Sequence, residues 1–93
     1  MIKAKRVDHF PDLKEPGQFL FYSQDGIEGH AGFTFLCPCG CGEHAGVQFI
    51  KGKNVFGWNW DGNEEEPTVT PSIRRLDGCE WHGHLTGGYF KEC

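Results

Sequence analysis

The cysteine pattern constrains the fold of this chain more than any other feature of its sequence. Residues 37–42 read Cys-Pro-Cys-Gly-Cys-Gly, and Cys79 precedes His82 by three positions. Structural zinc is held by four Cys or His side chains in tetrahedral geometry, and ligand pairs a few residues apart supply them well. Glycines let the backbone fold around the ion and direct amides toward the thiolates. The sequence therefore predicts one structural zinc ion that joins the two segments.

The first segment holds one cysteine more than a ligand pair requires. We expect Cys37 and Cys41 to be the ligands, because the C-x3-C span permits a full turn and leaves Cys39 beside the metal. Cys39 with Cys41 is the rival pair, and the sequence leaves this choice open.

The second segment supplies Cys79 and His82, whose C-x2-H spacing lets both side chains reach one metal from one turn. Cys93 is an alternative to His82, although a terminal position favours fraying. The five cysteines are odd in number, and three of them fall within five residues. Secreted disulfide frameworks usually have an even count at wider spacing, so this pattern indicates metal binding in a reducing cytosol.

Length and composition predict a single small β domain over residues 1–93. A domain of this size buries only about 60–65 % of the surface that its unfolded chain exposes, so a metal staple would strengthen a marginal core. The chain has 14 Gly, 8 Phe and 3 Trp but one Met. Aromatic residues suit pleated, half-buried surfaces better than helical bundles.

Short apolar and alternating runs predict the strands. We expect strands at residues 18–22, 33–37, 45–50, 55–60, 68–73, 82–85 and 89–91. The third and fourth runs are interpreted as one hairpin and the last two as another. The expected fold is a mostly antiparallel β-sandwich or partial barrel, stabilised by the structural zinc.

Two details refine this expectation. Phe56, Trp58 and Trp60 alternate along the chain, so we expect them to share one face in the core. Pro71 cannot donate a hydrogen bond to a neighbouring strand, which indicates that 68–73 is an edge strand.

The charge and the N-terminus narrow the location and the partners. A formal net charge of −4 gives no global field for binding phosphates, so nucleic acid is disfavoured as a partner. The opening residues contain no apolar signal region, and no run approaches the roughly 18 apolar residues of a membrane helix. We therefore expect a cytoplasmic protein in a bacterial host cell, without membrane attachment.

Four motifs together resemble a known family. They are the string at 37–42, Gly-Trp-Asn-Trp-Asp-Gly-Asn at 57–63, Pro-Thr-Val-Thr-Pro-Ser-Ile at 67–73, and Gly-Cys-Glu-Trp-His-Gly at 78–83. In this order they resemble an uncharacterised zinc-knuckle family of short bacterial and bacteriophage proteins, a domain of unknown function. The resemblance covers about residues 33–93 and implies that Cys37, Cys39 or Cys41, Cys79 and His82 hold zinc. It implies no activity.

No nucleophile–base pair and no phosphate-binding loop is evident, so we expect no catalytic residue. The function predicted from the sequence is a non-catalytic, phage-encoded interaction module that is stabilised by zinc and binds a host or phage protein. One alternative is a nucleic-acid-binding zinc ribbon. A second is a small zinc-dependent hydrolase, in which Glu43 or Glu80 would act as general base beside a three-ligand metal.

Overall fold

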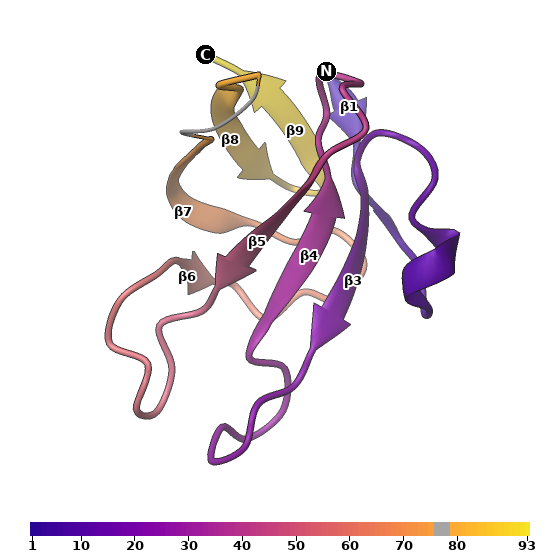
Figure 1. The fold of residues 1–93 in the computed structure, drawn as a ribbon. Coiled ribbons are helices and arrows are strands. Elements are labelled where there is room, and N and C mark those ends of the chain that lie inside the picture. Colours follow the sequence, from indigo (N-terminus) through magenta and orange to yellow (C-terminus); the bar gives the residue numbers. More distant parts are fainter. Residues whose placement is uncertain (76–78) are drawn as a thin grey trace.

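The computed structural model describes residues 1–75 and 79–93, which form two β-sheets packed face to face (Figure 1). The first sheet has the order β1 (Ile2–Lys3), β9 (Tyr89–Glu92), β8 (His82–Thr86), β7 (Val69–Arg74) and β6 (Asn59–Trp60). The second has the order β2 (Lys5–Arg6), β3 (Gln18–Tyr22), β4 (Gly32–Leu36) and β5 (His44–Gln48). A short 3-10 turn covers Phe10–Asp12.

The prediction of a mostly β, sandwich-like fold is confirmed. In the described ranges the chain contains no α-helix, and no helix there is long and apolar enough to cross a membrane.

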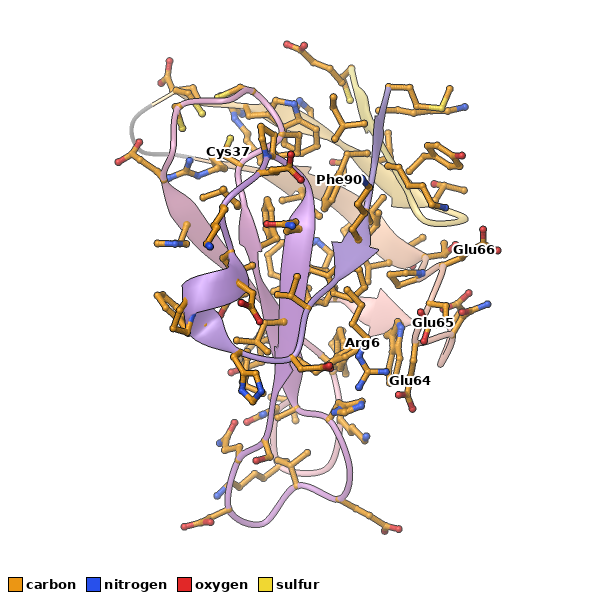
Figure 2. The ribbon with its side chains drawn as sticks, turned by 90° about the vertical axis from the view of Figure 1, so that its right-hand side faces the viewer. Arg6, Cys37, Glu64, Glu65, Glu66 and Phe90 are labelled. Atoms are coloured by element: carbon orange, nitrogen blue, oxygen red, sulfur yellow. The ribbon has the colours of Figure 1, made fainter. Side chains whose placement is uncertain are left out.

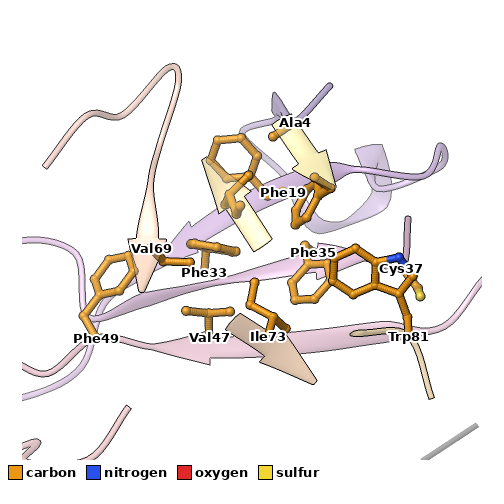
Figure 3. Close-up of a cluster of buried hydrophobic side chains, with 12 residues drawn as sticks. Ala4, Phe19, Phe33, Phe35, Cys37, Val47, Phe49, Val69, Ile73 and Trp81 are labelled. Atoms are coloured by element: carbon orange, nitrogen blue, oxygen red, sulfur yellow. The ribbon is translucent and has the colours of Figure 1, made fainter. Parts of the chain in front are cut away.

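The core between the sheets is dominated by phenylalanine (Figure 3). On β4, Phe33 and Phe35 point inward on either side of Thr34, as the two-residue period of a strand requires. Phe35 stacks on Phe90 of the opposite sheet with ring centroids 5.3 Å apart. The fully buried side chains come from both sheets and include Phe19, Phe33, Phe35, Val47, Phe49, Val69, Leu85 and Phe90.

This packing predicts a large loss of stability from one core truncation. Phe33→Ala should lower the free energy of unfolding by about 3–5 kcal/mol, because the side chain is fully buried and its removal leaves a cavity. Phe56→Ala is the matched control. Phe56 is 81 % exposed, so its truncation should change stability by less than about 0.5 kcal/mol. Urea titration followed by circular dichroism measures both, and equal losses would contradict this account of the core.

Several predicted elements are present. The run 18–22 coincides with β3, and the C-terminal hairpin is formed by β8 and β9. That hairpin turns at Gly87 and Gly88, whose φ angles of 55° and 80° favour glycine. The prediction that 68–73 is an edge strand is wrong, because β7 lies between β8 and β6. The short β6 pairs with Val69 and Thr70, so among the described residues Pro71 has no partner on that side.

The predicted hairpin of 45–50 with 55–60 is wrong. Residues 51–54 do form a turn, but the chain then bends at Gly57, and the β6 strand pairs with β7 instead of β5. A side chain at Gly57 would overlap the carbonyl oxygen of Gln48, so this crossing requires glycine. The three alternating aromatics consequently do not share one face. Phe56 is exposed, whereas Trp58 and Trp60 pack against the core.

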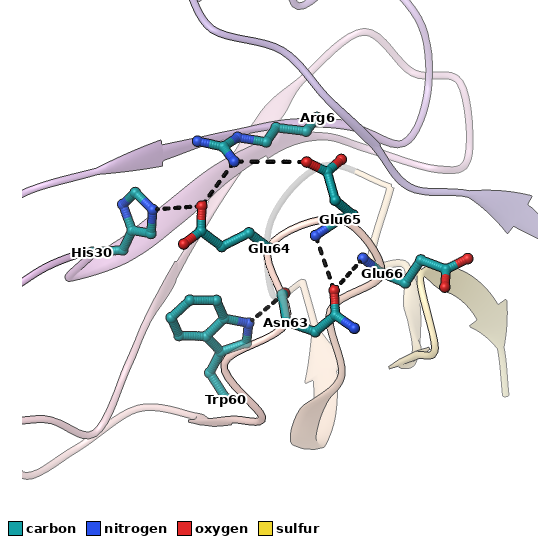
Figure 4. A network of polar contacts seen from close by, with 7 residues as sticks. All are labelled: Arg6, His30, Trp60, Asn63, Glu64, Glu65 and Glu66. Carbon is teal, nitrogen blue, oxygen red and sulfur yellow. Dashed lines mark hydrogen bonds and ion pairs between the residues drawn. The ribbon is translucent and has the colours of Figure 1, made fainter.

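The acidic run after β6 is tied to the N-terminal strands and is not simply solvated (Figure 4). Arg6 lies 2.8 Å from Glu64 and 3.9 Å from Glu65, and His30 lies 3.4 Å from Glu64. Hydrogen bonding to His30 and then to Arg6 lowers the pKa of Glu64. The side chain of Asn63 accepts hydrogen bonds from the backbone amides of the two glutamates that follow Glu64. This loop therefore spans from the first sheet to the N-terminal edge of the second.

Candidate functional site

Four cysteines meet at one end of the sandwich. The sulfur atoms of Cys37, Cys39, Cys41 and Cys79 all lie within 4.8 Å of one another. Cys37 is the buried member and lies 3.3 Å from both Cys39 and Cys79. Figure 3 shows it beside the Trp81 indole at the end of the core, and Figure 2 shows it far from the Arg6–Glu64 contact. The cluster joins the loop after β4 to the segment before β8.

This donor set fits a tetrahedral thiophilic metal. Zinc binds thiolates at about 2.3 Å, which places the sulfur atoms of a four-cysteine site about 3.8 Å apart. Two of the observed separations are 3.3 Å, and none exceeds 4.8 Å. The backbone amide of Cys41 also lies 3.3 Å from the sulfur of Cys39, a contact typical of knuckles that orient thiolates.

The local backbone explains how the cysteines converge. Gly40 and Gly42 have φ angles of 90° and 84°, which let the 37–42 loop turn back on itself. On the other side, Glu80 has a positive φ of 53°, which is uncommon for a side-chain-bearing residue. This turn separates Cys79, which faces the cluster, from Trp81, which enters the core.

Arg75 supports the cluster from the end of β7. Its guanidinium lies 3.7 Å from the sulfur of Cys41, 3.6 Å from that of Cys79 and 3.9 Å from the carboxylate of Glu43. The side chain is only 9 % exposed, so its charge is directed into the cluster. A cation in this position offsets the negative charge that four thiolates concentrate around a divalent metal.

The pKa values of two thiols in the cluster are shifted in opposite directions. Hydrogen bonds from Cys39 and Cys37 lower the pKa of Cys79 to about 7. The hydrogen bond to Cys79, and after it the hydrogen bond to Cys37, raises the pKa of Cys39 to about 12. A thiolate at Cys79 is thus accessible near neutral pH, and thiolates are the form that binds metal.

The structure does not bring His82 to this cluster. Its Nε2 atom instead lies 3.0 Å from the hydroxyl oxygen of Ser72. It does bring together all three cysteines of the first loop, so the geometry does not separate the pair Cys37–Cys41 from the rival pair Cys39–Cys41. Cys93 lies outside the cluster, with its backbone amide bonded to the carbonyl of His82.

Ser72 and His82 face each other across neighbouring strands. Arg74 of β7 is paired with His82 of β8, and the register of the two strands shifts between Val69 and Ile73. Such irregularities redirect side chains and occur often beside active sites. Because Ile73 and Trp81 point into the core, Ser72 and His82 lie on the outer face of the first sheet. Trp58 fixes the serine further by donating its indole N–H to the carbonyl of Ser72 at 3.2 Å.

A serine hydroxyl at hydrogen-bond distance from an imidazole is the arrangement of an activated nucleophile and its base. Among the described residues, no hydrogen bond joins the other ring nitrogen of His82 to a carboxylate. Sequence reasoning missed this pair. Its signal was weak, since a serine after Pro71 and a histidine three positions after Cys79 become neighbours only through strand register.

Residues 6–93 match one family model, described as BubE, a bacterial ubiquitination-like system serine protease. No curated protein and no solved structure gave a match.

The match overturns two expectations. The chain does not belong to the uncharacterised zinc-knuckle family of bacterial and bacteriophage proteins. It belongs to the family described as a serine protease of a bacterial ubiquitination-like system. The expected non-catalytic interaction module is wrong, because this family is one of serine proteases. The description gives no support to the zinc ribbon or to the small zinc-dependent hydrolase. The error arose because the metal motif is the strongest signal in the sequence, and the serine was therefore not considered.

Proposed function

This chain belongs to the BubE family, and we propose that it hydrolyses peptide bonds with Ser72 as nucleophile and His82 as general base. The observation that carries the proposal is the 3.0 Å contact between the Ser72 hydroxyl and His82 Nε2. The sequence contains one other serine, Ser23, which lies exposed after β3. Within the described residues Ser72 is the serine with a histidine partner.

The chemistry follows the general order of acyl transfer. With the proton of neutral His82 on Nδ1, Nε2 accepts the hydrogen bond that the Ser72 hydroxyl donates. As Oγ attacks the substrate carbonyl carbon, Nε2 takes the hydroxyl proton, and the imidazolium then gives it to the departing amine. Water, deprotonated by the same nitrogen, hydrolyses the resulting serine ester and restores both residues.

We further propose that the four-cysteine cluster binds zinc in a structural role. Two observations support this role. The donor set consists of thiolates alone, which would make zinc a weak Lewis acid, and the distances between the sulfur atoms fit tetrahedral coordination. Bound there, zinc would crosslink Cys37 at the end of β4 to Cys79, three residues before His82. The chain's own contribution is to hold the start of β8 against the second sheet, which fixes His82 opposite Ser72.

The substrate is proposed to be a protein of a bacterial ubiquitination-like system, as the family description suggests. A free-thiol cluster of this kind persists in a reducing compartment, which supports a cytoplasmic location for the reaction.

Covalent labelling tests the nucleophile without a known substrate. A fluorophosphonate probe phosphonylates activated serines, so intact-mass analysis and peptide mapping of the wild-type protein should find one adduct at Ser72. Ser72→Ala should abolish labelling and Ser23→Ala should leave it unchanged, since only Ser72 has a basic partner among the described residues. An adduct that maps to Ser23, or wild-type protein that stays unlabelled while folded and metal-loaded, would refute the assignment.

A further inference from the structure

A slot between the two sheets is partly filled by the chain itself. The amide of Trp58 donates to the carbonyl of Gln48 on β5, and the amide of Ile50 donates to the carbonyl of Trp58. The next two residues, Asn59–Trp60, pair with β7. One short segment therefore lies between the edges of β5 and β7 and bonds to both. This segment demonstrates that the space accepts an extended backbone.

Beyond Trp58 the slot continues as an open groove of about 330 Å³. It is lined by His44, Ala45 and Gly46 from β5, by Ile73, Arg74 and Arg75 from β7 and its end, and by Trp58. The groove lies beside Ser72, because Trp58 contacts the serine carbonyl and Ile73 follows the serine directly.

The β5 side of the groove presents unpaired backbone groups. The carbonyl of Glu43 accepts from Cys37, and the amide of Phe49 donates to Ala31, so odd-numbered residues of this strand bond toward β4. Gln48 bonds the other way, toward Trp58. By this alternation the amides and carbonyls of His44 and Gly46 point into the groove. Neither residue makes a backbone bond there within the described part of the chain.

The β7 side presents a second unpaired edge. The amide of Arg75 donates to the carbonyl of Trp81, the residue before β8, so Arg75 and Ile73 bond away from the groove. Arg74 then points its backbone groups into the groove, as the carbonyl of Ser72 does. Exposed strand edges of this kind readily pair with an added strand.

We propose that this groove binds a segment of the protein substrate as an added β-strand, extending the line of β6 and placing the scissile bond at Ser72. This inference rests on the serine protease function proposed above. Main-chain hydrogen bonds to Gly46 and Arg74 would hold the substrate backbone regardless of most of its side chains.

The charge of the groove specifies the substrate further. Arg74 is exposed and forms no ion pair with any described residue, whereas Arg75 is committed to the cysteine cluster and Glu43. In a chain of net charge −4, this local cation favours a segment with Asp or Glu near the cleaved bond.

The test uses tryptic peptides of a bacterial proteome as substrates, with new termini identified by mass spectrometry. Gly46→Pro removes one inward amide, and a side chain at Gly46 meets no atom within 4 Å. It should lower kcat/KM for the best-cleaved peptides about tenfold or more, since a main-chain bond and the added strand are lost. Labelling of Ser72 by the small fluorophosphonate, which needs no strand pairing, should stay within about twofold of wild type.

Arg74→Glu provides a second, independent arm. It should remove the enrichment of Asp and Glu around cleavage sites, whereas Lys14→Glu, with the same charge change on an exposed residue elsewhere, should preserve it. Cleavage by both groove variants at wild-type rates and with wild-type preference would overturn the proposal while leaving the protease intact. Wild-type protein that is never labelled would instead overturn the protease function itself.

Discussion

Ser72→Ala is expected to reduce the cleavage of peptides by about 10⁴-fold or more, because the hydroxyl that attacks the carbonyl is removed. His82→Ala should cost nearly as much. The double variant should be no worse than either single variant, since the two residues act as one unit. Initial rates of peptide cleavage by mass spectrometry measure all three proteins.

The controls separate catalysis from folding. Ser23→Ala changes an exposed serine of the same chemistry and should retain full activity. Ser72→Ala and His82→Ala should keep wild-type metal content and melting temperature, because neither side chain belongs to the cysteine cluster. Additive losses in the double variant would show that the two groups do not work together.

Removal of the metal is expected to unfold the half of the chain that carries the site. Apparent zinc-binding free energies in small metal-dependent domains run to about 10–16 kcal/mol, which exceeds typical net stabilities of about 5–15 kcal/mol. Chelation, or Cys79→Ser, should therefore abolish cooperative melting and activity together. Elemental analysis with circular dichroism measures the effect, and Cys93→Ser, which alters a cysteine outside the cluster, is the matched control.

Lower pH should release the metal before it unfolds the rest of the protein. Protons compete with a bound metal for the thiolates, so the affinity for the metal falls as pH decreases. Metal-free protein that melts as the loaded protein does would refute the structural role.

The sequence allowed the fold class and the cysteine cluster to be predicted, since both depend on local signals. Closely spaced cysteines with glycines between them predict a metal-binding turn, and this prediction does not depend on how the strands are arranged. The short apolar run at β3 and the Gly87–Gly88 turn likewise act over a few residues. The crossing at Gly57 was not predictable, because the reason for that glycine is the carbonyl of Gln48, which approaches only in the folded chain.

The serine–histidine pair was missed for a related reason. His82 stands at a ligand-like distance from Cys79 in the sequence, and this spacing suggested that both bind one metal. In the fold, Glu80 and Trp81 turn the chain, so that Cys79 faces the cluster and His82 faces Ser72. Which of two neighbouring sites a histidine joins is decided by strand register, and register depends on packing that no local pattern reveals.

The two contacts that define the site close chain loops of very different size. Ser72 and His82 are separated by 10 positions, whereas Cys37 and Cys79 are separated by 42. The loop-closure entropy differs accordingly, by about 1 kcal/mol. The Ser72–His82 contact therefore forms within a local hairpin. Of these two contacts, only the cysteine contact connects that hairpin to a strand from the first half of the chain.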